Sequence, residues 1–190
     1  MAISSIFNDV LGPVMRGPSS SHSAAACRIG LLLRQLMHEQ ITAIVIDYDP
    51  NGSLVTTHES QGTDMGLYGG LLGWEADDEQ MPHYRSALEK AGIETIVNYI
   101  DYGATHPNFY RISVSNSFIT HTLSAISTGG GMMEVLNIDG AEVSIFGDKY
   151  VVLIYGENLG LLQSMLPDWA QGNLRLTTSF IEISTLIEFK

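Results

Sequence analysis

The sequence predicts an α+β protein, with one medium domain followed by a smaller strand-rich region. Segments of helical periodicity and segments of strand alternation follow one another in irregular order, instead of repeating the βαβ unit of a parallel sheet. The chain has 190 residues, of which 45% are hydrophobic, and this is enough for one medium core or two small ones. Glycine (19) far outnumbers proline (6), which is typical of a globular protein rich in turns.

Apolar residues recur at helical spacing in five segments. The strongest is 23–40, where early alanines lead into a broad apolar face. Residues 63–74 indicate a helix interrupted at Gly69-Gly70, and 84–92 a short helix that ends at glycine. The other two candidates are 3–15, with Ser4 or Ser5 near its start and Gly12-Pro13 at its end, and 159–169.

Apolar runs, several of them alternating, predict the strands. Residues 41–48 form the clearest one, and Asp49-Pro50-Asn51-Gly52 predicts a hairpin turn into a second strand at 53–57. The further predicted strands are 93–100, 109–114, 132–138, 141–146, 150–155, 174–180 and 183–189, and 120–127 is left unassigned. The triple glycine at 129–131 breaks the chain, so we expect a boundary there between domains at 1–131 and 132–190.

Composition excludes several classes of function. The net charge is −12 with nine Lys and Arg, which disfavours nucleic acid as a partner. The single cysteine, Cys27, excludes an internal disulfide and any metal cluster held by this chain's thiolates alone. The N-terminal residues lack a basic start and an apolar signal core, and no apolar run approaches the roughly 20 residues that span a bilayer. We therefore expect a soluble, cytoplasmic protein without a membrane partner.

The loop Gly17-Pro18-Ser19-Ser20-Ser21-His22-Ser23 is the strongest candidate for chemistry. Glycine lets the backbone approach a ligand and proline stiffens that approach. The serines present hydroxyls and free N–H groups where the long helix begins, which suits a carboxylate. The alternative is that one serine simply caps the helix. His22 can move a proton near neutral pH or, alternatively, be a partly exposed first-turn residue.

This loop resembles the glycine–proline–triple-serine–histidine–threonine signature of the iron–sulfur L-serine dehydratases. Three further segments are similar to elements of that family, in the same order, and together the matches cover about residues 5–140. They are Gln61-Gly62-Thr63-Asp64 with Gly69–Gly73 and Asp77-Asp78, then His106-Pro107-Asn108, and Ser127–Gly131. Two positions depart from the family pattern: Ser23 and Phe109 each stand where threonine is usual.

The resemblance implies the β-part of an enzyme of amino-acid metabolism and gluconeogenesis that converts L-serine to pyruvate and ammonia. This β-part has an allosteric-substrate-binding-like fold and pairs with an α-part, whose cysteines hold a 4Fe-4S cluster. The α-part would be a separate subunit or a C-terminal continuation missing here, and the protein a homo-oligomer. Some relatives end in an ACT domain, a βαββαβ amino-acid sensor. Residues 141–190 predict only β-α-β-β, which indicates an incomplete, truncated ACT-like region.

The resemblance also implies the site residues. The catalytic ones would be His22, Ser20 and Ser21, and the substrate-binding ones Ser19, Ser23, Thr63, Asp64, His106 and Asn108, with no metal ligand in this chain. Thr63 and Asp64 also fit a helix cap. The remaining histidines (His38, His58, His83 and His121) and Cys27 fit surface or core positions. Two alternatives to the enzyme component stay open: a non-catalytic domain that senses serine or a related small acid, and a purely structural dimerisation domain.

Overall fold

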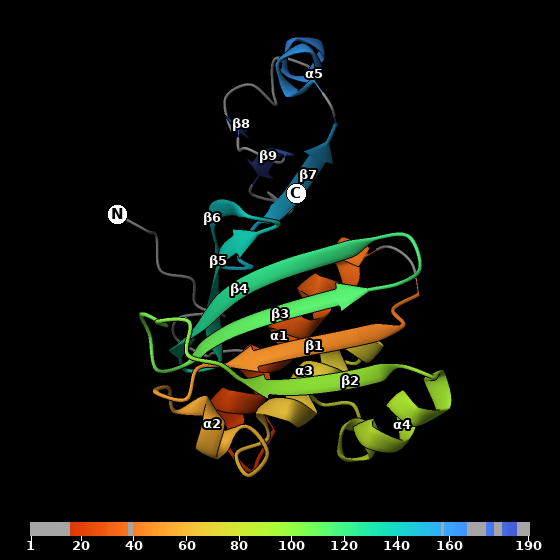
Figure 1. Cartoon of the computed structure of the whole chain (residues 1–190), viewed down its shortest axis with the longest axis vertical. Coiled ribbons are helices and arrows are strands. Elements are labelled where there is room, and N and C mark those ends of the chain that lie inside the picture. Colours follow the sequence, from red (N-terminus) through yellow and green to blue (C-terminus); the bar gives the residue numbers. More distant parts are fainter. Residues whose placement is uncertain (1–15, 38–39, 157, 167–173, 177–179, 186–190) are drawn as a thin grey trace, which may run out of the picture.

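The computed structural model describes residues 16–37, 40–156, 158–166, 174–176 and 180–185. The helix expected over 3–15 lies outside the described residues. The described elements are helices and strands of a mixed sheet, and this confirms the α+β class (Figure 1).

A six-stranded sheet forms the centre of the protein, in the order β2-β1-β3-β4-β5-β6. Its strands are β1 (Ala43–Tyr48), β2 (Glu94–Tyr99), β3 (Phe109–Ser115), β4 (Thr120–Gly129), β5 (Met132–Ile138) and β6 (Ala141–Ile145). Strands β1 and β2 are parallel, and every other neighbouring pair is antiparallel. The segment left unassigned in the sequence, 120–127, is therefore most of a central strand.

Two helices cover one face of this sheet (Figure 1). These are α1 (Ser20–Met37) and α3 (Thr63–Leu72). In β1 and β3 every second side chain is buried, so the inward residues pack against the helices. The fully buried side chains include Ile44, Ile46, Tyr48, Tyr110 and Ile112 from the sheet and Ile29 and Leu33 from α1. Burial of each such side chain stabilises the fold by about 1.5–3 kcal/mol.

Glycines at the contact between α1 and α3 let the two backbones touch. A Cβ atom on Gly66 would lie 2.1 Å from the Ser23 carbonyl oxygen, and one on Gly70 would lie 2.2 Å from the Cys27 carbonyl oxygen. The sequence predicted an interruption at Gly69-Gly70, but α3 continues through both residues. The prediction was wrong because the cost of glycine within a helix is offset here by the close approach of α1.

The predicted hairpin after β1 is also wrong, because residues Leu54–Thr57 form a short helix, α2. The turn that precedes α2 does exist: the Gly52 N–H donates to the Asp49 carbonyl at 2.9 Å. It leads into a helical turn in which the Thr57 hydroxyl donates to the Ser53 carbonyl at 2.8 Å. Both edges of β1 are occupied by β2 and β3, so no position is left for a hairpin partner.

The remaining helix near the sheet follows the sequence prediction. It is α4 (Tyr84–Ala91), preceded by a 3₁₀ turn at Met81–His83, and it ends at Gly92 in the left-handed conformation (φ 67°). A glycine tolerates this conformation without steric cost, and the helix therefore stops where the sequence indicated.

A second, smaller sheet follows β6. It consists of β7 (Tyr150–Tyr155), β8 (Leu174–Leu176) and β9 (Phe180–Thr185) in the order β7-β9-β8, with helix α5 (Leu159–Met165) between β7 and β8. The triple glycine at 129–131 is the turn from β4 to β5 and has positive φ at each residue. The predicted boundary at residue 131 thus falls within the six-stranded sheet, and the division into domains itself stays a prediction.

Candidate active site

Each of the four segments that resemble the dehydratase family has residues at one end of the six-stranded sheet, where the segments contact one another in two pairs. The loop before α1 reaches the segment before α3, where the Ser19 N–H donates to the Gln61 carbonyl at 3.2 Å. The loop before β3 reaches the end of β4, where the Ser127 N–H donates to the Asn108 carbonyl at 3.1 Å. The end of β1 and the parallel end of β2 lie at this same end of the sheet. We call this region the motif end of the sheet.

The serine loop, residues 16–23, is held by bonds among its own members. The Ser23 side chain is buried, and its hydroxyl donates to the carbonyls of Arg16 and, at 3.2 Å, Ser20. The Ser19 hydroxyl and His22 Nδ1 are hydrogen-bonded at 2.8 Å. Ser23 therefore fixes the shape of the loop, and Ser19 holds the His22 ring through Nδ1, while Nε2 has no hydrogen-bond partner among the described residues.

Two serines of the loop remain available to a ligand. The Ser20 side chain is exposed and that of Ser21 is half-buried. Neither hydroxyl bonds to another described residue, and the same holds for the N–H groups of Ser20, Ser21 and His22 in the first turn of α1. The simple capping alternative is not seen in the described contacts, since the Ser19 hydroxyl bonds to an imidazole ring. The loop can therefore offer hydroxyls and N–H groups to an anion.

Thr63 and Asp64 lie inside the protein. Asp64 accepts hydrogen bonds from His58 Nδ1, 2.9 Å from each carboxylate oxygen, and from the Tyr48 hydroxyl at 3.4 Å. Burial raises the pKa of Asp64, and the nearby His58 acts against this rise. The Thr63 hydroxyl lies beside that of Tyr110, and neither makes a hydrogen bond of ordinary geometry to a described residue. A role for Thr63 and Asp64 as substrate ligands stays a prediction.

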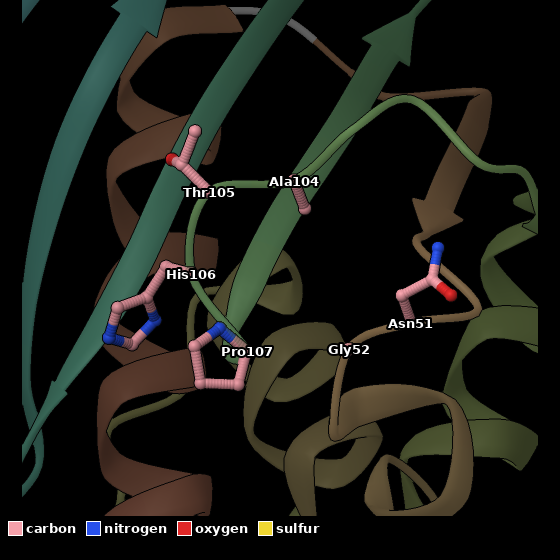
Figure 2. A pocket seen from close by; sticks show the side chains of 6 residues that line it. All are labelled: Asn51, Gly52, Ala104, Thr105, His106 and Pro107. Carbon is pink, nitrogen blue, oxygen red and sulfur yellow. The ribbon is translucent and has the colours of Figure 1, made fainter.

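His106 and Asn108 lie in the loop before β3, beside a hollow of about 220 Å³. Its lining residues are Asn51, Gly52, Ala104, Thr105, His106 and Pro107 (Figure 2). The Asn108 N–H donates to His106 Nδ1 at 3.1 Å, so the neutral ring carries its proton on Nε2. The Ser53 hydroxyl donates to the Asn108 side chain. In Figure 2 the His106 ring projects away from Asn51, with Pro107 between them.

Asp49, at the end of β1, holds this loop in place. Its carboxylate accepts the N–H groups of Ala104 at 2.9 Å, Tyr102 at 3.3 Å and Asn51 at 2.9 Å. These bonds, with that from Ala104 the strongest, hold the pKa of Asp49 below its usual value. From the sequence, Asp49 is predicted only as a turn residue, because residue spacing gives no signal of partners more than 50 positions away.

Sequence reasoning also missed the chain of contacts around His58. His58 is 6% exposed and bonds to Asp64 on one side, and through Nε2 to the Tyr99 hydroxyl at 2.9 Å on the other. His121 is likewise buried and bonded to Asp139 at 2.7 Å, at the opposite end of β4 from Ser127. Both fit the predicted reading as satisfied core histidines.

A 4Fe-4S cluster requires several cysteine thiolates, and this chain has one cysteine. Burial, followed by the charge of Glu75, raises the pKa of Cys27 to about 12, and its thiol donates to the Trp74 carbonyl at 3.4 Å. Within the described ranges no three His, Cys, Asp or Glu side chains are grouped to hold a metal ion. The residues present therefore do not fit a cluster held by this chain alone. None of the described helices is long and apolar enough to cross a membrane.

Comparisons with known proteins give a consistent relationship. No protein-family model matches the chain. The chain is 35% identical over 154 residues to the probable L-serine dehydratase, beta chain, of Bacillus subtilis (strain 168). The matched region covers 81% of this chain and 69% of that protein. It is 32% identical over 158 residues to the L-serine dehydratase, beta chain, of Peptoniphilus asaccharolyticus, covering 81% of this chain and 70% of that protein. At this identity and coverage, the chain belongs to the family of L-serine dehydratase beta chains.

Proposed function

We propose that this chain is the β-part of an L-serine dehydratase and supplies substrate contacts to an active site completed by an α-part. The observation that carries the proposal is the convergence of the four family segments at the motif end of the sheet. The hydroxyls of Ser20 and Ser21 have no partner among the described residues and lie at the N-terminus of an 18-residue helix. A site of this kind suits the carboxylate of a small amino acid.

Dehydration of serine removes the α-proton and expels the β-hydroxyl, which gains a proton and leaves as water. The resulting aminoacrylate tautomerises to an imine, which water hydrolyses to pyruvate and ammonia. In the proposed site, Ser20, Ser21 and the N–H groups of the first turn hold the carboxylate. His22, held through Nδ1 by its hydrogen bond with Ser19, moves a proton at the substrate through Nε2. His106, with its proton on Nε2, donates a hydrogen bond to a substrate oxygen, and Asn108 is held beside it.

The hydroxyl of serine is a poor leaving group and requires a Lewis acid. We infer that a 4Fe-4S cluster on the α-part would supply this chemistry, because a cluster needs several cysteine thiolates and this chain has one cysteine, which is buried. The relatives are named beta chains, which supports a separate α-chain as partner. The serine loop would then form half of a site at the interface between the two parts.

A second candidate function is regulatory. The small sheet has the element order β-α-β-β with strand order β7-β9-β8, which corresponds to the first part of the βαββαβ pattern of an ACT-like sensor. In this alternative the chain binds serine or a related small acid and adjusts its partner without contributing to catalysis. We infer an allosteric-substrate-binding-like fold for the six-stranded sheet and its helices on the same family grounds.

Reconstitution tests the enzymatic proposal. The chain alone should be inactive, and addition of the α-part with iron and sulfide under anaerobic conditions should give serine-dependent pyruvate. Ser20→Ala and His22→Ala should reduce that activity by about a hundredfold or more, the usual contribution of one acid–base or binding group. His83→Ala, on the exposed surface before α4, is the matched control and should leave activity unchanged.

Two outcomes oppose the proposal. Full activity of both loop variants would remove the serine loop from the site. Calorimetry with the isolated chain separates the regulatory alternative: specific, stoichiometric serine binding without an α-part favours a sensor, whereas no binding favours a site that is complete only in the assembly.

A further inference from the structure

The buried pair His58 and Asp64 joins the end of α2 to the start of α3. His58 is the C-terminal cap of α2, and Asp64 lies in the first turn of α3. Besides the two side-chain bonds from His58 Nδ1, the Asp64 N–H donates to the His58 carbonyl at 3.0 Å. The two residues are therefore tied by backbone and side chain, and the chain between them forms a closed turn, which we call the 58–64 turn.

The serine loop rests on this turn. The Ser19 N–H donates to the Gln61 carbonyl at 3.2 Å. Gly62 has φ 82°, and a Cβ atom there would lie 3.0 Å from Pro18 Cδ, so backbone and proline ring are in close contact. Any change in the shape of the 58–64 turn must therefore move Pro18 and Ser19, and with Ser19 the bond that orients His22.

Few neighbouring groups could replace His58 as a hydrogen-bond donor to the Asp64 carboxylate. Among the described residues, the other hydrogen bond to the Asp64 carboxylate comes from the Tyr48 hydroxyl, at a long 3.4 Å. The nearby Glu59 has the same charge sign as Asp64. The Nδ1–H of His58 is thus the principal donor to a buried carboxylate, and a carboxylate without a donor would open the turn toward water.

We propose that His58 is a positioning residue: its bond to Asp64 holds the 58–64 turn in the shape that seats the serine loop for substrate. This inference rests on the proposed function, because the proposed function assigns serine binding to the loop. His58 acts only through Asp64 and the turn and has no place among the groups that touch serine.

Two substitutions of His58 separate its two bonds. The amide nitrogen of asparagine stands at the same number of bonds from the backbone as Nδ1, and that of glutamine at the same number as Nε2. His58→Asn therefore keeps a donor for Asp64, whereas His58→Gln keeps only the contact toward Tyr99. His121→Gln is the matched control, because His121 has a similar burial and a similar carboxylate partner, Asp139, far from the serine loop.

The first measurement is amide hydrogen exchange of Ser19 in the full chain, which needs no α-part. We expect exchange to be about tenfold faster in His58→Gln, the size of one lost hydrogen bond to a charged group, and close to wild type in His58→Asn and His121→Gln. Equal exchange in the two His58 variants, or an equal acceleration in His121→Gln, would overturn the inference.

The second measurement uses the enzyme reconstituted with its α-part. The KM for serine should rise about tenfold in His58→Gln with a smaller change in kcat, and His58→Asn should restore it. A similar fall in stability without this KM change would show that the pair is only structural and would refute the proposal. If the wild-type assembly itself makes no pyruvate, the proposed function fails, while the exchange measurement still reports on the positioning of the loop.

Discussion

The contact between α1 and α3 predicts that alanine in place of Gly66 or Gly70 destabilises the protein. The added Cβ atoms would lie 2.1 Å and 2.2 Å from backbone carbonyl oxygens of α1, and ordinary contact begins near 3.4 Å. One helix must therefore move by roughly 1 Å or more against a packed core, because a backbone oxygen has no rotamer into which it could turn away.

The expected magnitude follows from two opposing effects. Overpacking costs up to about 3 kcal/mol, and the better helix propensity of alanine returns about 1 kcal/mol. We expect a net loss of about 2 kcal/mol, which corresponds to a fall in Tm of about 4–8 °C for a chain of this length. Thermal unfolding of the full chain followed by circular dichroism measures the shift.

Gly160→Ala in α5 is the control for this prediction. Among the described residues its Cβ atom would meet no atom closer than 3.8 Å. Only the higher helix propensity of alanine then acts, and the local stability should rise by about 0.5–1 kcal/mol. If Gly66→Ala and Gly70→Ala melted at or above the wild-type temperature, the reasoning from close backbone contact would be refuted.

Three further predictions concern single side chains. Cys27 should resist iodoacetamide at pH 8 in the folded chain and react after unfolding in urea, because its pKa of about 12 leaves almost no thiolate; rapid alkylation of the native chain would contradict its burial. Ser23→Ala should cost about 1–2 kcal/mol in urea unfolding, because it leaves the Arg16 carbonyl without its donor, and Ser23→Thr should recover most of the loss. Asp49 has a lowered pKa when folded, so its contribution to stability is present at neutral pH and is lost as the pH falls below about 4 through the folded pKa. The stability difference between wild type and Asp49→Asn should therefore shrink in acid, and a difference that is independent of pH would refute this role.

Local sequence patterns were sufficient to predict an element where its structure depends on the residues of that segment alone. The alternation in β3 and the apolar face of α1 predicted both elements, since side-chain periodicity is a property of the segment alone. They failed at 53–57, where the turn chemistry of Asp49-Pro50-Asn51-Gly52 suits a hairpin equally well. There the occupied edges of β1 decided the outcome, and those edges belong to strands that lie far away in the sequence.

The candidate site shows the same division. The serine loop could be found from sequence because its residues are adjacent and its shape depends on Ser23 and Ser19 within the loop. The hydrogen bond between His58 and Tyr99 could not be found from the sequence, since the two residues lie 41 positions apart. They meet only because β2 pairs in parallel beside β1. Pairing between strands that are not consecutive is invisible to a reading of local periodicity.

Strand β4 carries a further consequence for the smaller sheet. At its beginning, His121 bonds to Asp139, which also accepts the hydroxyl of Tyr155 from β7. Near its end, Ser127 bonds to the loop that carries His106, about 20 Å away at the usual rise of a strand. A single strand, paired regularly with β3 and with two register shifts along β5, thus connects the smaller sheet to the motif end. Its register with β3 resists sliding because a slip by one residue would turn every buried side chain outward. We therefore expect a displacement at Tyr155 to reach the motif end of the sheet through β4, as a tilt of the strand and not as a local rearrangement.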